Sequence, residues 1–203
     1  IQDQNFDKDK VEYNIDAING KKKINIKPPV EYQKDGDKYY NKLILKKEAQ
    51  YHIQVRCTDK AGNVSETVAM KEFIIDTTTP VVHIVGVKQN GIYQGKKIMP
   101  QVICKDRYLD GASVEISLKK INGRDVLDKE WNYERTESEN TVQVQWDNIK
   151  KTKNSDGIYY LQVKGEDKAG NKIRDDFKVV FRVNQRGADF ILNNALKKKI
   201  SKY

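Results

Sequence analysis

The sequence predicts an all-β fold in which antiparallel β-sandwiches follow one another along the chain. Three observations lead to this prediction. A strand-and-turn segment occurs twice, apolar and polar residues alternate over many short stretches, and turn residues separate these stretches. Alternation with a period of two is the pattern of a strand with one buried face. Short strands with regular turn signals favour an antiparallel sandwich or barrel over a parallel sheet.

The repeated segment covers residues 51–63 and 159–171. The two copies read YHIQVRCTDKAGN and YYLQVKGEDKAGN, at an offset of 108 positions. Upstream, residues 11–20 match residues 114–123 at an offset of 103, so the second copy has five extra residues in a connection. Surface connections tolerate such insertions. Repetition at this spacing indicates an array of like modules.

The alignment of the two copies predicts the module boundaries. Residues 80–185 are expected to form a complete module of about 100 residues, the usual size of a two-sheet sandwich. Residues 1–79 form a module that lacks its first strands, because the first copy has nothing that matches residues 80–105. Residues 186–203 are expected to be a linker and the start of a next module. We therefore expect the chain to be a piece of a longer array.

Each stretch of alternation in the second module predicts one strand. The expected strands are residues 81–87, 98–104, 113–118, 141–146, 159–165 and 177–183. Pro100 implies a sheet edge or the start of a strand, because proline has no backbone N–H to donate. Asn122 and Gly123 predict a turn, since this pair tolerates positive φ.

The C-terminal tail has a different pattern. Between Ala188 and Tyr203 the apolar residues fit one face of a helix with 3.6 residues per turn. Asp189 would cap such a helix, and Lys197–Lys199 would suit its C-terminal end. We expect a short helix here. The alternatives are the opening strand of a next module and a disordered end.

Two tyrosines and two turns are expected to have structural roles. Tyr51 and Tyr159 stand where immunoglobulin-like sandwiches place a tyrosine corner, in which the hydroxyl bonds to upstream backbone. The two Asp-Lys-Ala-Gly-Asn segments predict hairpin turns, because Gly accepts positive φ and Asp or Asn bonds nearby backbone. The residues assigned structural roles are Tyr51, Tyr159, Gly62, Gly170, Asn63 and Asn171. Calcium binding is the alternative for these turns, but each offers too few oxygen ligands, so no metal site is predicted.

Composition argues against several functional classes. The 38 Lys and Arg exceed the 29 Asp and Glu, giving a net charge of +9. The basic residues are interleaved with acidic ones and lack an aromatic stacking motif, which disfavours nucleic acid. His52 and His83 lack metal-ligand spacing. Cys57 and Cys104 fall in different modules and are expected to be buried and unpaired. No cofactor motif, catalytic triad or membrane-length apolar run is present.

One recurring phrase resembles a known family. Asp59–Asn63 followed by Phe73–Pro80 resembles the bacterial Ig-like repeats of large surface and secreted proteins, especially of Gram-positive anaerobes. Asp167–Asn171 and Phe181–Asn184 carry the phrase again, with Asn-Gln-Arg-Gly in place of the Asp-Thr-Thr-Thr linker. The resemblance implies tandem immunoglobulin-like sandwiches outside the cell. It also raises the expectation of Lys–Asn isopeptide cross-links, although no residue here singles itself out.

These patterns leave three functional hypotheses. The leading one is a non-enzymatic spacer or adhesion segment of an extracellular protein, whose partners are neighbouring Ig-like modules. Its rival is a binding module for a host surface protein or an anionic glycan, with Tyr39, Tyr40, Trp131 and Tyr133 as contacts. Those aromatic residues have a structural alternative, since strand aromatics are often partly buried. The least favoured hypothesis makes the modules accessory domains of a larger extracellular enzyme.

Overall fold

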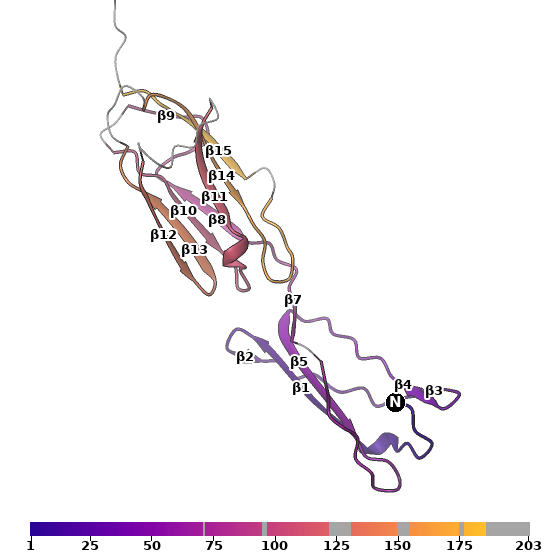
Figure 1. The fold of residues 1–203 in the computed structure, drawn as a ribbon. Coiled ribbons are helices and arrows are strands. Elements are labelled where there is room, and N and C mark those ends of the chain that lie inside the picture. The colour runs from indigo at the N-terminus through magenta and orange to yellow at the C-terminus, as the bar shows by residue number, and fades with distance from the viewer. Residues whose placement is uncertain (71, 95–96, 122–130, 150–154, 175–176, 186–203) are drawn as a thin grey trace, which may run out of the picture.

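The fold consists almost entirely of strands, which form two groups in succession along the chain (Figure 1). The computed structural model describes residues 1–70, 72–94, 97–121, 131–149, 155–174 and 177–185. We call strands β1–β7 the first unit and strands β8–β15 the second unit. This arrangement confirms the predicted all-β class. The helix expected in the tail lies outside the described residues, among which no helix is long and apolar enough to cross a membrane.

The second unit consists of two facing sheets. One sheet joins β8 (Val81–Val85), β10 (Gln101–Lys105), β12 (Tyr133–Ser138) and β13 (Thr141–Trp146) in the order β12-β13-β10-β8. The other joins β9 (Gly91–Tyr93), β11 (Glu115–Lys120), β14 (Gly157–Lys164) and β15 (Lys178–Val183) in the order β11-β14-β15-β9. The β9–β15 pair is parallel and the other described pairs of this unit are antiparallel. A 3-10 turn at Gly111–Ser113 precedes β11.

The core of the second unit follows from the alternation in its strands. In β13, Val142, Val144 and Trp146 are buried, whereas the residues between them are half-buried. From the opposite sheet, Tyr159 and Phe181 stack with 5.6 Å between ring centroids. Full burial of one such large apolar side chain contributes about 1.5–3 kcal/mol. The two inner faces therefore stabilise each other.

In each unit, a tyrosine hydroxyl near the start of one strand, β5 or β14, donates a hydrogen bond to the backbone just before that strand. The hydroxyl of Tyr159 donates to the carbonyl of Ser155 at 2.6 Å, and the hydroxyl of Tyr51 donates to the carbonyl of Lys47 at 2.6 Å. Both tyrosines are fully buried. The bond runs four residues back along the chain in both cases, which is the geometry of a tyrosine corner.

The first unit consists of one sheet and a separate hairpin. The sheet contains β1 (Val11–Asn19), β2 (Lys22–Lys23), β5 (Ala49–Cys57), β6 (Val68–Ala69) and β7 (Phe73–Ile75). The hairpin contains β3 (Gln33–Asp35) and β4 (Lys38–Tyr40), and a 3-10 turn at Lys8–Lys10 precedes β1.

The two units share one strand register. Glu12 of β1 lies opposite Arg56 of β5, and the matching Glu115 of β11 lies opposite Lys164 of β14. The pairing of β5 with β7 corresponds in the same way to the pairing of β14 with β15. Since a slip of one residue would turn every side chain to the other face, this agreement shows that the repeated sequence forms the same sheet twice.

The cores of the two units differ in size. Among the described residues, the main cluster of the second unit holds eighteen buried apolar residues. The cluster of the first unit holds three, namely Ala17, Ala49 and Tyr51. Partly buried side chains pack against these three: Ile24, Ile26, Leu45, Phe73 and Ile75. The sheet of the first unit is therefore covered by irregular chain segments, where the second unit has a facing sheet.

The two cysteines are both free. Cys104 in β10 is fully buried, and this burial raises the pKa of its thiol to about 11. Cys57, at the end of β5, is only half-buried. The expectation that Cys57 is buried was therefore wrong, because alternation near a strand end does not ensure cover from a second sheet.

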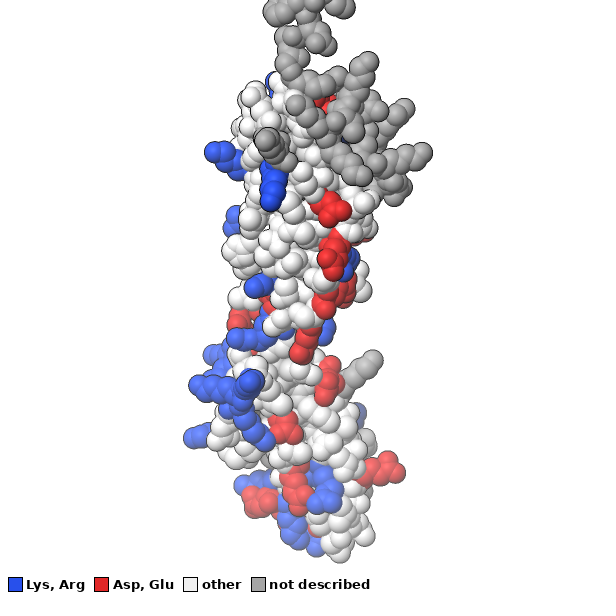
Figure 2. All heavy atoms as spheres, turned by 90° about the vertical axis from the view of Figure 1, so that its left-hand side faces the viewer, with Lys and Arg blue, Asp and Glu red and all other residues white. Residues whose placement is uncertain are grey.

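Charged side chains of both signs are spread along the surface. On the side shown in Figure 2, Lys and Arg lie among Asp and Glu over both units. Oppositely charged residues also pair directly, as Arg56 does with Glu12 at 2.5 Å and Lys23 with Asp16 at 2.7 Å. On this side, neither sign of charge is confined to one unit.

Replacing Tyr159 by Phe tests the tyrosine corner of the second unit. The change removes the hydroxyl that donates to the carbonyl of Ser155, a fully buried residue. We expect the free energy of unfolding to fall by about 1–3 kcal/mol, the usual cost of leaving a buried polar group without its partner. Denaturant unfolding measures this. Tyr160→Phe is the matched control, because Tyr160 is half-buried and neighbours Tyr159 in β14; equal losses in both variants would contradict the role.

Candidate functional site

The aromatic residues proposed as ligand contacts fall in different units. Tyr39 and Tyr40 lie in β4 of the first unit, and Tyr133 lies in β12 of the second. Tyr39 is half-buried, and its ring packs against Phe6 with 4.5 Å between centroids. Tyr40 and Tyr133 are exposed by 42% and 47%. The structure thus leaves Tyr40 and Tyr133 accessible, on separate sheets.

Trp131 is a core residue and not a surface contact. It is 1% exposed, and its ring makes T-shaped contacts with Tyr159 and Phe181, with 5.7 and 6.4 Å between centroids. Its indole N–H donates to the carbonyl of Asp147. The expectation that Trp131 contacts a ligand was wrong. The ring is part of the core of the second unit, where burial of a large aromatic side chain is favourable.

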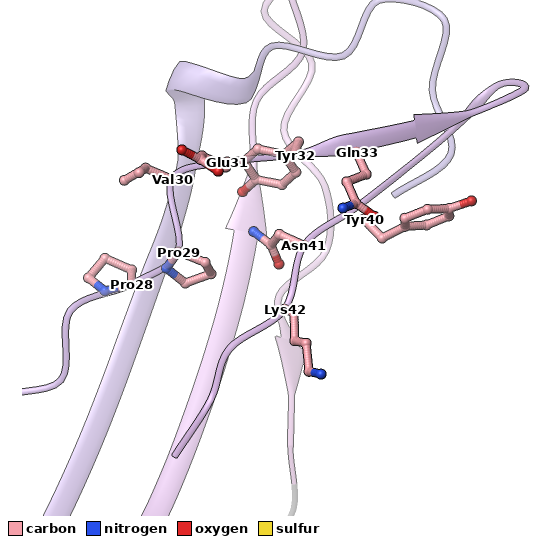
Figure 3. Close-up of a pocket in the computed structure, with 9 residues that line it drawn as sticks. All are labelled: Pro28, Pro29, Val30, Glu31, Tyr32, Gln33, Tyr40, Asn41 and Lys42. Atoms are coloured by element: carbon pink, nitrogen blue, oxygen red, sulfur yellow. The ribbon is translucent and has the colours of Figure 1, made fainter. Parts of the chain in front are cut away.

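A groove in the first unit lies beside Tyr40 (Figure 3). It has a volume of about 630 Å³ and is open to solvent. Its lining comes from two segments, Pro28–Gln33 and Tyr40–Lys42. Two of the lining residues bond to Tyr13: the hydroxyls of Tyr13 and Tyr32 lie 2.8 Å apart, and the Asn41 amide donates to the Tyr13 hydroxyl at 2.6 Å. These polar groups therefore already bind one another.

The two Asp-Lys-Ala-Gly-Asn segments form the same closed turn. In the second, the Asp167 carboxylate accepts the backbone N–H of Asn171 at 2.9 Å and its side-chain amide at 2.8 Å. Asp59 accepts the same two groups of Asn63, at 2.7 and 2.9 Å. Gly170 sits at φ 89° and Gly62 at φ 92°, a region open to glycine at little cost.

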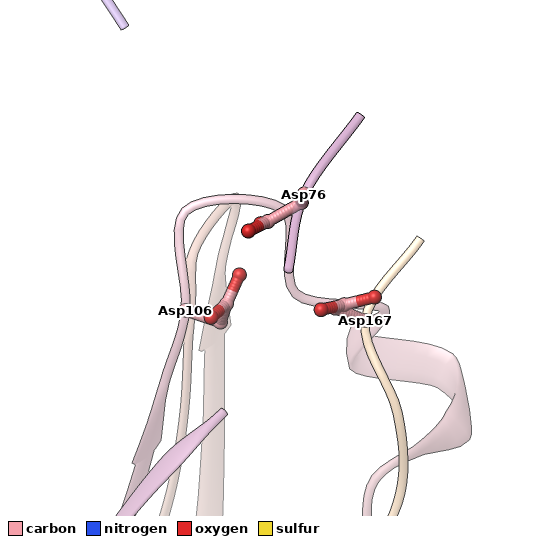
Figure 4. Close-up of side chains that lie close together, drawn as sticks. All are labelled: Asp76, Asp106 and Asp167. Carbon is pink, nitrogen blue, oxygen red and sulfur yellow. The ribbon is translucent and has the colours of Figure 1, made fainter. Parts of the chain in front are cut away.

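The second of these turns lies where the two units meet. Asp76 follows β7 of the first unit, Asp106 follows β10, and Asp167 follows β14 (Figure 4). One carboxylate oxygen from each lies within 4.8 Å of the others. The side-chain amide of Asn171 also donates to the backbone carbonyl of Asp76 at 3.1 Å. The repeated turn of the second unit therefore holds the chain where it leaves the first unit.

Two further residues of the second unit reach the first. Arg107 donates from its guanidinium to the side-chain oxygen of Asn19. Tyr108 is 9% exposed, and its hydroxyl donates to the carbonyl of Ile18 at 3.3 Å. Asn19 in turn donates to the carbonyl of Glu48 at 2.8 Å. These contacts join the loop after β10 to the end of β1.

A hollow of about 690 Å³ lies beside these contacts, with residues of both units around it. Its lining includes Gln50, Phe73 and Ile74 from the first unit, and Arg107, Tyr108 and Lys168 from the second. The contact between the units is therefore a small set of hydrogen bonds beside open space. Domains joined by a small, polar contact move relative to one another by default, so any restriction on the angle between these units depends on these few hydrogen bonds.

Burial and two neighbouring carboxylates together make the charged form of Asp106 unfavourable. Burial raises the pKa of Asp106, and the nearby Asp76 and Asp167 carboxylates raise it further. The hydrogen bond from the backbone N–H of Tyr108 and the charge of Arg107 act in the opposite direction. Since the raising effects prevail, the charged form of Asp106 costs free energy in the folded chain.

Oxygen ligands at this spacing are the kind that a hard cation such as calcium takes. All three carboxylates already accept local hydrogen bonds, Asp106 from the backbone N–H of Tyr108 at 2.8 Å. Asp167 binds Asn171, and Asp76 accepts the backbone N–H of Thr78 at 3.0 Å and its hydroxyl at 2.7 Å. Acidic groups also gather at protein surfaces without any ion. The effect of this grouping that the structure supports is that the charges of Asp76 and Asp167 disfavour the charged form of Asp106.

Two of the three junction carboxylates have counterparts in the first unit, away from the junction. Asp3 corresponds to Asp106 at the offset of 103, and it accepts the backbone N–H of Asn5 at 2.6 Å. In the second unit, Asp106 accepts the backbone N–H of Tyr108 at 2.8 Å. Asp59 corresponds to Asp167 at the offset of 108. The local hydrogen bonds of two of the three junction carboxylates therefore recur in the first unit.

Sequence reasoning did not find the junction. It treated each Asp-Lys-Ala-Gly-Asn segment alone and counted the oxygens within it. The carboxylates that meet are Asp76, Asp106 and Asp167, which are far apart in the sequence. An available signal was that Asp3 and Asp106 occupy matching positions ahead of each repeat, outside any predicted strand.

The model of a family of bacterial Ig-like domains matches residues 41–77 and 111–182, more than half of the sequence. The chain belongs to the bacterial Ig-like domain family. Domains of this family are generally non-catalytic and typically lie at the cell surface or outside the cell. The matched ranges take in β5 and β14 with their tyrosine corners and both repeated turns.

Solved structures with weak similarity to this chain include tandem Ig domains of titin. The titin Ig tandem domains A164-A165 are 14% identical, with 86% of this chain and 88% of that chain covered and a TM-score of 0.36. The titin domains z1z2 in complex with telethonin are 12% identical, with 87% and 83% covered and a TM-score of 0.33. Likeness at this level adds no argument about function. The comparison with curated proteins gave no match.

Replacing Asp106 by Asn tests the cost of its charge at the junction, to which both burial and the Asp76 and Asp167 carboxylates contribute. Asparagine keeps an oxygen for the Tyr108 N–H but carries no charge. At pH 7, without divalent cations, we expect unfolding to cost on the order of 0.5 kcal/mol more in the variant, the scale of partly exposed charge pairs. Because Asp106 has a raised pKa when folded, the folded chain holds its proton more tightly. The difference in the free energy of unfolding between the variant and the wild type should therefore shrink as the pH falls through that raised pKa.

Thermal unfolding across this pH range gives the measurement, and Glu115→Gln is the control. Glu115 is exposed and lies on β11, and its replacement removes one negative charge from the same unit. Equal effects of the two substitutions at every pH would contradict this cost. Repeating the scans with calcium chloride separates the cost of the charge from ion binding, since a bound ion would raise the wild-type midpoint more than that of Asp106→Asn.

Proposed function

We propose that this chain is a non-enzymatic spacer or adhesion segment of a bacterial surface or secreted protein, of the kind found in Gram-positive organisms. The observation that carries the proposal is the bonded junction. The second unit holds the first through Arg107, Tyr108 and Asn171. Bonds of this kind restrict the angle between successive units. A restricted angle suits a protein that must keep a terminal part away from a surface.

The linker between the units supports the same role. Residues 76–80 read DTTTP, and Pro80 fixes its own φ and restricts the residue before it. Thr77 donates from its hydroxyl to the Glu48 carboxylate at 2.5 Å, and Thr78 binds Asp76. Side-chain bonds from two consecutive threonines thus hold a linker that would otherwise be free to turn.

A binding role for a host protein or an anionic glycan is the second candidate. It is favoured by the exposed Tyr40 beside the groove of the first unit and by the net charge of +9. A glycan array probed with the chain tests this candidate directly. Binding that Tyr40→Ala abolishes would favour it over the spacer role.

Loosening the junction tests the spacer role. Arg107→Ala combined with Tyr108→Phe removes two hydrogen bonds between the units. We expect 15N relaxation to give one shared rotational correlation time for both wild-type units, and two shorter, different times in the variant. Each hydrogen bond contributes only about 0.5–1.5 kcal/mol, so both units should stay folded.

Arg182→Ala serves as the control, because it removes the same charge at an exposed position of β15. Independent tumbling of the two units in the wild-type chain would refute a restricted spacer.

A further inference from the structure

Strand β8 is an open edge of the second unit. It stands at the end of the sheet order β12-β13-β10-β8 and pairs on one side with β10 along its whole length, from Val81 to Val85. On its other side, residues 81–85 have no backbone hydrogen bond to any part of the chain that the structure describes. Pro80 precedes this edge and Gly86 follows it, so its length is set within the chain.

This edge lacks the features that usually protect a sheet edge from pairing with another chain, namely charged residues, proline and bulges. Among the described edge strands, β2, β3, β4, β11 and β12 all contain charged residues. Strands β6, β7 and β9 contain none, but each has only two or three residues. Strand β8 has five residues, VVHIV, with no charged residue and no proline. Four of the five are β-branched, the type that strands favour.

The side chains of β8 alternate between the core and the solvent. Val82 and Ile84 are half-buried and pack against the core of the second unit. Val81 and Val85 are each 53% exposed, and His83 between them is also exposed. The open edge therefore carries two valines in water on its outer face, and two apolar side chains on its inner face that are only partly covered.

The side-chain pattern of β8 has the same character in both directions. A valine stands at each end, His83 stands in the middle, and Val82 and Ile84 flank it. An antiparallel copy of the strand, centred on His83, would place Val81 opposite Val85 of the second copy, and Val82 opposite Ile84 of the second copy. Each apolar side chain would then meet an apolar one. A two-fold contact requires this kind of self-complementary surface.

We propose that β8 pairs antiparallel with β8 of a second copy of this chain, about a two-fold axis at His83, so that two four-stranded sheets join into one continuous sheet. Main-chain groups supply the affinity in such strand addition, and the apolar pairs on both faces add to it. Because the paired edge is short, the dimer belongs to the class of small, weak interfaces. The proposal does not rest on the spacer role, since it requires nothing of the angle between the units.

Sedimentation equilibrium of the whole chain tests this pairing, over concentrations that reach the range of about 1 mM, where weak contacts associate. We expect the wild-type chain to form reversible dimers. His83→Lys places two lysines opposite each other at the axis, and like charges placed opposite each other across strands are destabilising. We expect the dissociation constant to rise at least about tenfold. Since His83 is exposed, thermal unfolding should show both units still folded.

Thr136→Lys is the matched control. Thr136 is exposed and lies in β12, at the opposite edge of the same sheet. It lies in the same cross-strand row as His83, through Gln143 and Ile103. The substitution therefore adds the same charge to the same face, away from the proposed axis, and should leave the dimer unchanged.

A charge swap tests the register. His83→Glu alone should weaken the dimer as His83→Lys does, because it also places two like charges at the axis. An equal mixture of the two variants places opposite charges there, so it should form dimers at least as tightly as the wild-type chain.

Each outcome decides the proposal. Dimers that each variant weakens, that the mixture restores and that Thr136→Lys leaves intact support it. A wild-type chain that stays monomeric throughout would overturn it and leave the edge to a different polypeptide. Dimers that His83→Lys does not weaken, or that Thr136→Lys weakens equally, would also overturn it, because the contact would then lie elsewhere or depend on net charge. A mixture that fails to associate would contradict the two-fold axis at His83, and with it the proposal.

Discussion

A β-sheet with one apolar face must have that face removed from water, and both units can be understood from this constraint. In the second unit, two sheets face each other, and the rings of Tyr159 and Phe181 fill the space between them. In the first unit, the same sheet in the same register is covered by Ile24, Ile26 and Leu45 from irregular segments. The difference between the units lies in the cover of the sheet.

Repetition made much of the fold predictable. The offsets of 103 and 108 place β1, β5 and β7 against β11, β14 and β15, and the ladders agree with this alignment. The alternation in residues 141–146 gave β13 with its bounds. Burial was harder to predict at positions that depend on a facing layer. Trp131 is buried and Cys57 only half-buried. The local sequence pattern alone does not show which of the two side chains is covered by other parts of the chain.

The junction was out of reach for a different reason. Asp76, Asp106 and Asp167 each satisfy a local rule at the end of a strand or in a turn, and each accepts a backbone N–H nearby. Their closeness is a property of how two units meet, which local spacing does not encode. The tyrosine corners were predictable from the sequence, since each is defined by one tyrosine and a carbonyl four residues earlier.

The hydrogen bonds of Tyr108 and Arg107 across the junction bear on the reach of any chain built from such units. Angular deviations at successive joints accumulate along an array. With stiff joints, the end-to-end distance grows almost in proportion to the number of units, whereas with free joints it grows only as roughly the square root of that number. A few side chains per joint therefore set how far such an array extends, without altering the core of any unit along it.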